Sequence, residues 1–133
     1  MHVGQGKNVY EWIEHWARIP NTESGRSNGR THGVVVTNDG TVVVFNQANP
    51  AVLLFDASGA LISSWGDRFG GAHGMTLVQE NGTEYLWLTD QYSGEVVKTT
   101  LDGKNVLNLE RASHPVYEKS SYAPTWVAVH EEQ

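Results

Sequence analysis

The feature that most constrains the fold of this chain is an internal repeat. Residues 31–36 read THGVVV and residues 72–77 read AHGMTL, so that a His-Gly pair returns 41 positions later. Each copy is followed by a Gly-containing turn and then by an apolar run rich in β-forming residues. Self-similarity at one fixed period is typical of stacked structural units. We therefore expect two copies of one module.

The spacing of short apolar runs predicts what each module is. Four such runs occur in each copy, and tight turns of Gly, Asn and Asp separate them. Four strands in roughly 40 to 45 residues is the period of a β-propeller blade. We predict an all-β fold, a partial β-propeller in a single domain over 1–133, with one blade at about 31–66 and a second at about 72–110. The expected strands lie at 33–37, 41–45, 51–55, 61–65, 74–79, 85–88, 95–100 and 105–109.

Each end of the chain is expected to add one flanking strand. Residues 9–17 contain alternating apolar and polar positions, and residues 124–130 begin with a run that aligns with the start of the second blade. A closed propeller needs about four blades or more, so the chain reads as part of a larger ring. Uncovered blade faces and open strand edges then favour self-association.

Composition excludes several classes of function. Nine basic residues stand against fifteen acidic ones, a net charge of −6, and no Lys or Arg cluster is present to follow a nucleic acid backbone. No apolar run could span a bilayer and no signal peptide is visible, which predicts a soluble chain without a membrane partner. The absence of Cys removes disulfide and thiolate chemistry. A small molecule or a peptide remains as a possible ligand.

His32 and His73 are the first candidate site residues, because they occupy the same place in the two modules. That place is the start of the strand that would line the channel of a propeller. Imidazoles from different blades can converge on Zn²⁺ or a similar ion. Alternatively, each ring hydrogen-bonds a carbonyl of the neighbouring blade and locks the ring of blades. The sequence leaves both interpretations open.

Polar residues that end the second strand of each module form a second candidate group. They would line the rim of the channel and bind a ligand there, although Asp90 also has the character of a turn residue that caps backbone N–H groups. The two long connections, 21–30 and 111–121, are expected to shape a pocket at the same mouth. The predicted binding rim consists of Asn46, Gln47, Asn49, Asp90, Gln91 and Tyr92.

Several of these motifs carry a resemblance to a known family. The His73-Gly74-Met75 run, YLWLTD at 85–90, GEVVK at 94–98 and APTWVAV at 123–129 resemble consecutive blades of the six-bladed NHL-repeat propellers. Within that class the chain is most similar to the peptidyl-α-hydroxyglycine α-amidating lyases, over about 31–129. The resemblance implies a catalytic zinc ion held by three channel-facing His and a structural calcium ion held partly by backbone carbonyls.

Carried over by position, the resemblance places His73 on a zinc ligand, and Val34 and Met75 on calcium-binding carbonyls. His32 matches none of the family's zinc ligands. Gln47 stands where the lyases have an Arg, and Gln cannot supply the positive charge that steadies a substrate carboxylate. The other zinc His, a catalytic Tyr and a calcium-binding Asp belong to blades that would follow Gln133.

The resulting expectation is a fragment of a lyase-related propeller. It would contribute channel-facing residues to a metal or ligand site and would not be catalytic alone, so that no catalytic residue can be assigned within the chain. Zinc and calcium are the expected cofactors. Two alternatives are a non-catalytic binding or protein-interaction scaffold, and a metalloenzyme of the carbon-nitrogen or carbon-oxygen lyase class that further blades or oligomerisation would complete.

Overall fold

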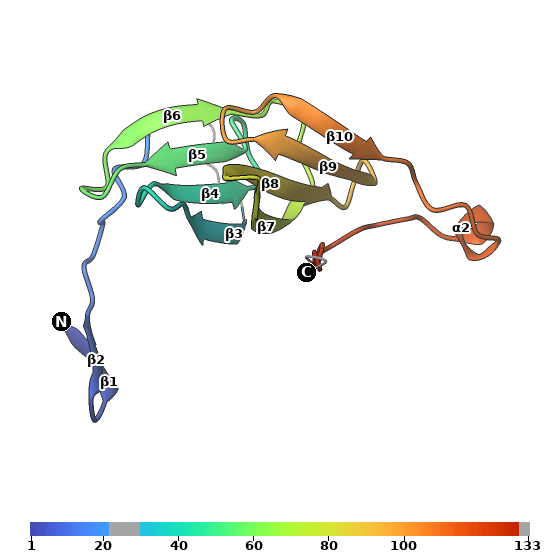
Figure 1. Ribbon diagram of the computed structural model, residues 1–133. Coiled ribbons are helices and arrows are strands. Elements are labelled where there is room, and N and C mark those ends of the chain that lie inside the picture. The colour runs from blue at the N-terminus through green and yellow to red at the C-terminus, as the bar shows by residue number, and fades with distance from the viewer. Residues whose placement is uncertain (22–29, 131–133) are drawn as a thin grey trace.

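A computed structural model describes residues 1–21 and 30–130, and these residues form antiparallel sheets of two, four and four strands (Figure 1). The prediction of an all-β chain is confirmed. The strands of the first four-stranded sheet follow one another in sequence order, and those of the second do likewise. The first sheet contains β3 (Thr31–Val36), β4 (Val42–Asn46), β5 (Val52–Phe55) and β6 (Leu61–Trp65). The second contains β7 (Ala72–Glu80), β8 (Thr83–Asp90), β9 (Glu95–Thr100) and β10 (Asn105–Leu109).

These eight strands lie where the apolar runs predicted them, and short polar turns fix their order. In the turn after β3, the Asp39 carboxylate accepts hydrogen bonds from the hydroxyl of Thr37 and from the backbone N–H of Thr41. These bonds hold the pKa of Asp39 below its ordinary value. The turn between β9 and β10 repeats the pattern with Thr100 and Asp102. Turn chemistry therefore repeats together with the strands.

The hydrophobic core lies between the two four-stranded sheets. β3 and β7, the first strand of each sheet, lie against each other, and each is an edge strand of its own sheet. Their approach depends on Gly33, because a Cβ atom there would lie 2.6 Å from Cβ of Met75. The buried core side chains come from both sheets and from the connection between them; they are Val43, Phe45, Ala51, Val52, Leu54, Phe69, Ala72, Met75, Leu86, Leu88 and Val97.

A second contact joins the outer parts of the two sheets. The indole Nε1 of Trp65, at the end of β6, donates a hydrogen bond of 2.9 Å to the carbonyl of Leu101 in the turn between β9 and β10. The ring also lies on Gly103 of that turn, where an added Cβ would come within 2.6 Å of it. The sheets are thus held at the β3–β7 edge and again near their outer strands.

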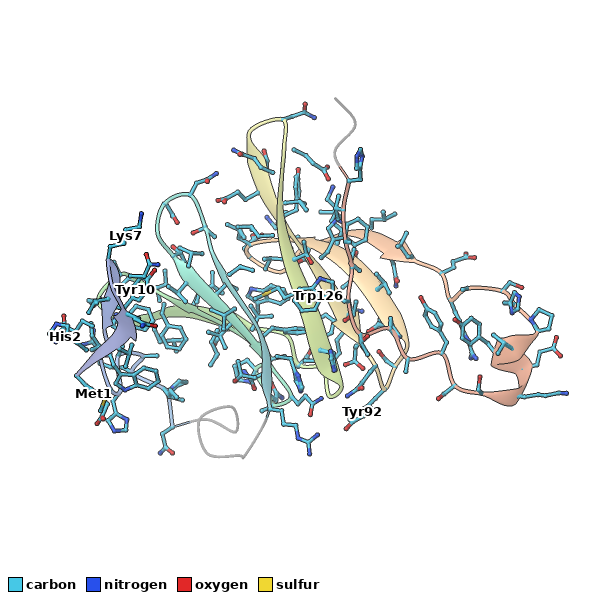
Figure 2. All side chains as sticks on the ribbon, turned by 90° about the horizontal axis from the view of Figure 1, so that it is seen from below. Met1, His2, Lys7, Tyr10, Tyr92 and Trp126 are labelled. Carbon is cyan, nitrogen blue, oxygen red and sulfur yellow. The ribbon has the colours of Figure 1, made fainter. Side chains whose placement is uncertain are left out.

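In the N-terminal part, the strand predicted at 9–17 is present only as far as Glu11, and the prediction is wrong for positions 12–17. β1 (His2–Gln5) and β2 (Asn8–Glu11) pair with each other in a separate hairpin, and no strand is assigned between positions 12 and 21. Gly6, at a φ of 62°, supplies the turn conformation that closes a two-residue hairpin loop. The local turn at Gly6 therefore determines the conformation of this segment. The hairpin lies apart from the two larger sheets, and Figure 2 places Met1, His2, Lys7 and Tyr10 together at that end of the molecule.

The polypeptide after the hairpin covers part of the outward face of the first sheet. The ring of Trp16 lies 6.4 Å from that of Phe55, and the backbone N–H of Arg18 donates to the carbonyl of Gly59 at 2.7 Å. Val34 and Val36 on β3 remain about 60% exposed on this face. The outward face of the first sheet, which the sequence predicted to be uncovered, is therefore covered by this segment near β5 and exposed along β3.

The prediction of a strand at 124–130 is also wrong, because the structure has no regular strand between positions 121 and 130. The segment nevertheless runs along β7. The hydroxyl of Thr76 donates to the carbonyl of Val127 at 2.6 Å, and a Cβ on Gly74 would lie 2.5 Å from the carbonyl oxygen of Thr125. Side-chain bonds hold this segment, which is why its position is fixed without strand pairing.

The connection from β10 to this segment contains the short helix α2 (Val116–Lys119). α2 lies away from both sheets and buries none of its residues (Figure 1). Within the described part of the chain, no helix has the length and apolar character needed to cross a membrane.

Candidate functional site

The candidate site is built by His32 and His73 at the edge where β3 meets β7. Both residues lie where the antiparallel register shifts: between Thr31 and Gly33 in the first sheet, and between Ala72 and Met75 in the second. Such irregularities turn a side chain away from its regular direction. The two sheets thus use the same local device to present an imidazole at the same edge.

The two imidazole rings are stacked on each other. Their centroids are 4.4 Å apart and their planes are inclined by 18°. The sequence predicted that these residues converge, and the structure places them in direct contact. Offset face-to-face packing of this kind holds both rings in defined orientations.

A carbonyl outside the two sheets determines the tautomer of His73. Its Nδ1 lies 3.0 Å from the carbonyl oxygen of Thr125, which can only accept, so Nδ1 carries the proton. In the neutral ring the Nε2 lone pair then remains available to a metal ion or to a donor. The sequence left two roles open for His73, a hydrogen bond to a neighbouring carbonyl and metal binding. His73 makes the carbonyl contact through Nδ1 and keeps Nε2, the nitrogen that metal binding requires.

The surroundings of His32 favour the neutral form of its ring. Burial, the neighbouring His73 and the guanidinium of Arg30 together lower the pKa of His32 below 6.5, with burial the largest cause. Its Nε2 is buried and has no hydrogen-bond partner. An unpaired buried ring nitrogen is costly, and such atoms often mark a ligand site.

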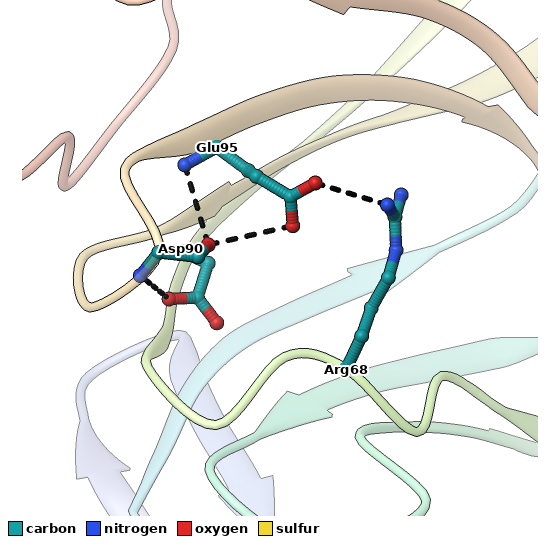
Figure 3. Close-up of polar contacts among 4 residues, drawn as sticks. Arg68, Asp90 and Glu95 are labelled. Carbon is teal, nitrogen blue, oxygen red and sulfur yellow. Dashed lines mark hydrogen bonds and ion pairs between the residues drawn. The ribbon is translucent and has the colours of Figure 1, made fainter.

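Asp90, for which the sequence left a binding rim and a backbone-capping role open, is a buried residue that caps backbone N–H groups. Its carboxylate accepts hydrogen bonds from the backbone N–H groups of Gly71, Tyr92 and Ser93, at 2.8, 2.8 and 2.9 Å. Arg68 forms an ion pair of 2.9 Å with Glu95 (Figure 3). In the strand register, Glu95 is the partner of Asp90. These bonds hold the turn after β8 in place and leave this carboxylate turned inward.

Within the described residues, the other rim residues of the second sheet form no hydrogen bond with the His pair. The backbone N–H of Gln91 donates to Gly71, and Gln91 is partly buried. Tyr92 is 74% exposed, and Figure 2 shows it at the surface.

In the first sheet, Asn46 occupies the position of Asp90 and is also buried. Its Nδ2 donates to the carbonyl of Ala51 at 3.1 Å, whereas its Oδ1 is buried without a partner. Gln47 and Asn49 line a polar hollow of about 380 Å³ together with Asp67. The amide Nε2 of Gln47 is buried and unpaired. Gln47 and Asn49 are thus the residues of the predicted rim that line a hollow.

Val34 and Met75, the positions that the family resemblance linked to calcium, lie on β3 and β7. Val34 pairs with Val44, and Met75 pairs with Leu88 and is almost fully buried. Ca²⁺ takes six to eight oxygen ligands, and these two positions would supply only two backbone carbonyls. Within the described residues, no group of three or more His, Cys, Asp and Glu side chains could hold a metal ion. The calcium site stays a prediction.

The long connections contribute a hollow of their own. Residues 111–115 together with Tyr117 and Glu118 line a hollow of about 450 Å³ within the loop around α2. The other connection was predicted over 21–30, and its positions 22–29 lie outside the described residues.

Sequence reasoning missed the Thr125 carbonyl as a partner of His73. The signal that could have revealed this contact is the alignment of 124–129 with the start of β7. By analogy with β7, which lies beside β3, this alignment predicts that the segment lies beside β7. A comparison of the chain with models of protein families, with curated proteins and with solved structures finds no match.

Proposed function

We propose that this chain is a two-blade segment of an NHL-type β-propeller related to the amidating lyases. In this proposal the edge formed by β3 and β7 lines the channel, and His73, with His32 stacked on it, contributes to a metal or ligand site that other blades complete. The stacked His pair at equivalent positions of two sheets is the observation that carries the proposal.

A repeated contact between neighbouring units supports the propeller arrangement. Gly33 of the first sheet receives Met75 of the second, and Gly74 receives Trp126, whose Cα would lie 2.8 Å from an added Cβ. The two contacts are equivalent under the sequence repeat. The segment at 124–129 therefore occupies the place of a third inner strand.

The residues present fit part of a zinc site. His73 has its Nδ1 hydrogen-bonded to a carbonyl, the outer contact that commonly orients a zinc-binding imidazole. A catalytic zinc site usually needs three protein ligands, of which this chain offers two imidazoles at most. When bound, zinc would polarise an oxygen atom or activate a water molecule. In this site His73 would present its Nε2 to the ion, and His32 would hold the His73 ring in place by stacking on it.

The test is zinc binding by the purified chain and by its His73→Ala variant. Because the ligand set is incomplete, we expect weak binding by the unmodified chain, detectable by zinc titration with NMR of the imidazole nitrogens. The Nε2 signal of His73 should shift on titration, and His73→Ala should abolish the specific change. His114→Ala removes an exposed imidazole in the loop around α2 and serves as the matched control.

Two results would contradict the proposal. One is a zinc response that is the same in the unmodified chain, in His73→Ala and in His114→Ala. The other is a response centred on His114. Either result would remove the metal-binding part of the proposal and leave the ligand-binding part without its main support.

A non-catalytic binding scaffold is the second candidate, and one observation favours it. The polar hollow beside Gln47 contains an unpaired buried amide nitrogen and the exposed side chains of Asn49 and Asp67. These groups suit a small polar ligand that both donates and accepts hydrogen bonds. Binding there would be independent of zinc and unaffected by His73→Ala, which separates the two candidates.

A further inference from the structure

The turn that joins β7 to β8 consists of two residues, Asn81 and Gly82. The residues on either side, Glu80 and Thr83, pair with each other. Asn81 and Gly82 have positive φ angles of 49° and 78°, the conformation that Asn-Gly adopts in two-residue hairpin loops. All residues from 79 to 83 are exposed. Water therefore reaches both turn residues.

The two groups of this dipeptide that can react with each other are free. Among the described residues, none forms a hydrogen bond with the side-chain amide of Asn81 or with the backbone N–H of Gly82. Gly82 has no side chain to hinder an approach to its nitrogen, and an added Cβ would meet no atom within 4 Å. An electrophilic carbonyl carbon and a nitrogen nucleophile thus lie side by side in the chain, both in solvent.

The equivalent turn of the first sheet engages both groups. There Asp39-Gly40 stands where the second sheet has Asn81-Gly82. The backbone N–H of Gly40 donates to the carbonyl of Thr37 at 3.0 Å. The carboxylate of Asp39 accepts two hydrogen bonds within the turn. The first turn also shows that an Asp at this place of the repeat is compatible with a hairpin.

The other described asparagines each lack a requirement of the same reaction. Asn49 precedes Pro50, which has no N–H. Asn46 is buried and is followed by Gln47. The remaining ones precede a residue whose side chain hinders attack by its nitrogen; they are Asn8, Asn21, Asn38, Asn105 and Asn108. The sequence has a second Asn-Gly pair at positions 28 and 29, which lie outside the described residues.

We propose that Asn81 of the folded chain is a site of intramolecular deamidation. The backbone nitrogen of Gly82 loses its proton to solvent and attacks Cγ of Asn81, and a new C–N bond closes a succinimide ring. The bond between Cγ and the side-chain nitrogen breaks, and that nitrogen takes up a proton and leaves as ammonia. No oxidant or reductant takes part.

Water then opens the ring at either of its carbonyl carbons. Cleavage between Cγ and the nitrogen of Gly82 gives aspartate with the original main chain. Cleavage between the backbone carbonyl carbon of residue 81 and that nitrogen gives isoaspartate, in which the main chain runs through Cγ. For each Asn81 converted, one water molecule is consumed and one ammonia molecule is released.

The two products differ in their effect on the hairpin. Isoaspartate inserts an additional carbon atom into the main chain of a two-residue loop, which disturbs the pairing of Glu80 with Thr83. Glu84 follows on β8, and its Oε1 accepts a hydrogen bond of 2.9 Å from the backbone N–H of Asn38 in the first sheet. Isoaspartate therefore loosens this contact between the sheets, whereas aspartate leaves it in place. The proposal does not depend on the metal or ligand site at the inner edge.

Peptide mapping by mass spectrometry tests the site. The purified chain is incubated at mildly alkaline pH, which favours loss of the amide proton, and a sample taken at the start gives the background. Trypsin places positions 81 and 28 in separate peptides, 69–98 and 27–30. We expect position 81 to exchange NH for O several-fold faster than any other described asparagine. Asn105, exposed at the start of β10, is the control within the chain.

Isotope labelling and variants test the mechanism. In water enriched in heavy oxygen, the product should incorporate one heavy oxygen atom and separate chromatographically into aspartate and isoaspartate forms. Asn81→Gln would require a larger ring and should not convert, and Asn105→Gln should leave conversion at position 81 unchanged. Amide hydrogen exchange at Asn38 should be faster in the isoaspartate form than in the fresh chain. Freshly prepared Asn81→Asp should retain the original exchange rate.

Three results would overturn the proposal. One is a folded chain in which Asn81 persists while a synthetic peptide of residues 77–85 converts, because the fold would then protect the turn. Another is conversion of Asn105 as fast as that of Asn81. The third is an isoaspartate form in which exchange at Asn38 is unchanged. Circular dichroism checks that each variant remains folded, and none of these measurements involves zinc, so a failure here is distinguishable from a failure of the proposed function.

Discussion

The two four-stranded sheets share a sequence repeat and differ in how firmly their equivalent parts are held. Asp90 in the second sheet accepts three backbone N–H groups, whereas Asn46 at the same place in the first makes one side-chain bond and leaves Oδ1 unpaired. β7 and β8 have nine and eight residues, and β3 and β4 have six and five. A repeated pattern thus specifies the same topology without the same strand lengths or the same hydrogen bonds at the strand ends.

The largest difference is expected from truncating these two equivalent side chains. Asp90→Ala would leave three N–H groups without their acceptor, one of them in a buried bond, and should lower the free energy of unfolding by about 3 kcal/mol. Asn46→Ala removes one bond and an already unpaired oxygen, and should cost about 1 kcal/mol. Urea denaturation of the two variants measures the difference. Equal losses would show that the two turns are energetically alike.

A second pair of variants compares the close contacts at two glycines, Gly33 on β3 and Gly74 on β7. Gly33→Ala would force the Cβ atoms of residues 33 and 75 apart in the core, and we expect a loss of about 2 kcal/mol in the free energy of unfolding. Gly74→Ala meets the carbonyl of Thr125 and Cα of Trp126. Because that segment lies outside both sheets, the variant should release it while the core stays folded.

Limited proteolysis and thermal denaturation distinguish these outcomes. In Gly74→Ala, cleavage near 121–130 should accelerate with little change in the melting temperature. The opposite pattern, with global destabilisation and no new cleavage, would mean that the segment at 124–129 belongs to the folded core.

The smallest expected effect is the pH dependence that distinguishes His32. Its folded-state pKa is lowered from 6.5, so below that pH the unfolded chain binds more protons at this site than the folded chain does. Above pH 6.5 His32 is neutral in both states and does not reduce the stability of the fold. As the pH falls from 6.5 through the lowered folded-state pKa, stability is lost. His32→Gln should reduce the fall in melting temperature between pH 7.5 and 5. An unchanged pH dependence would show that His32 is not the group responsible.

The sequence predicted the eight strands of the two sheets because alternating apolar runs and Gly-Asp turns are local signals that the fold obeys. It predicted the convergence of His32 and His73 because equivalent positions in stacked units lie side by side. It did not predict the N-terminal hairpin, where Gly6 sets a turn unrelated to the repeat. It left two roles open for Asp90, on a binding rim or as a cap of backbone N–H groups, since sequence alone does not show whether a strand-end carboxylate faces a channel or three backbone N–H groups.

The two contacts that join the sheets have a consequence for curvature. At the inner edge Gly33 removes a side chain, so the sheets approach closely; at the outer edge the indole of Trp65 stands between the first sheet and the turn at Gly103. A stack that is thin on one side and thick on the other is a wedge, and successive wedges bend into an arc. The angle between neighbouring sheets is therefore set by side-chain volume at two positions, the absent one at Gly33 and the large one at Trp65.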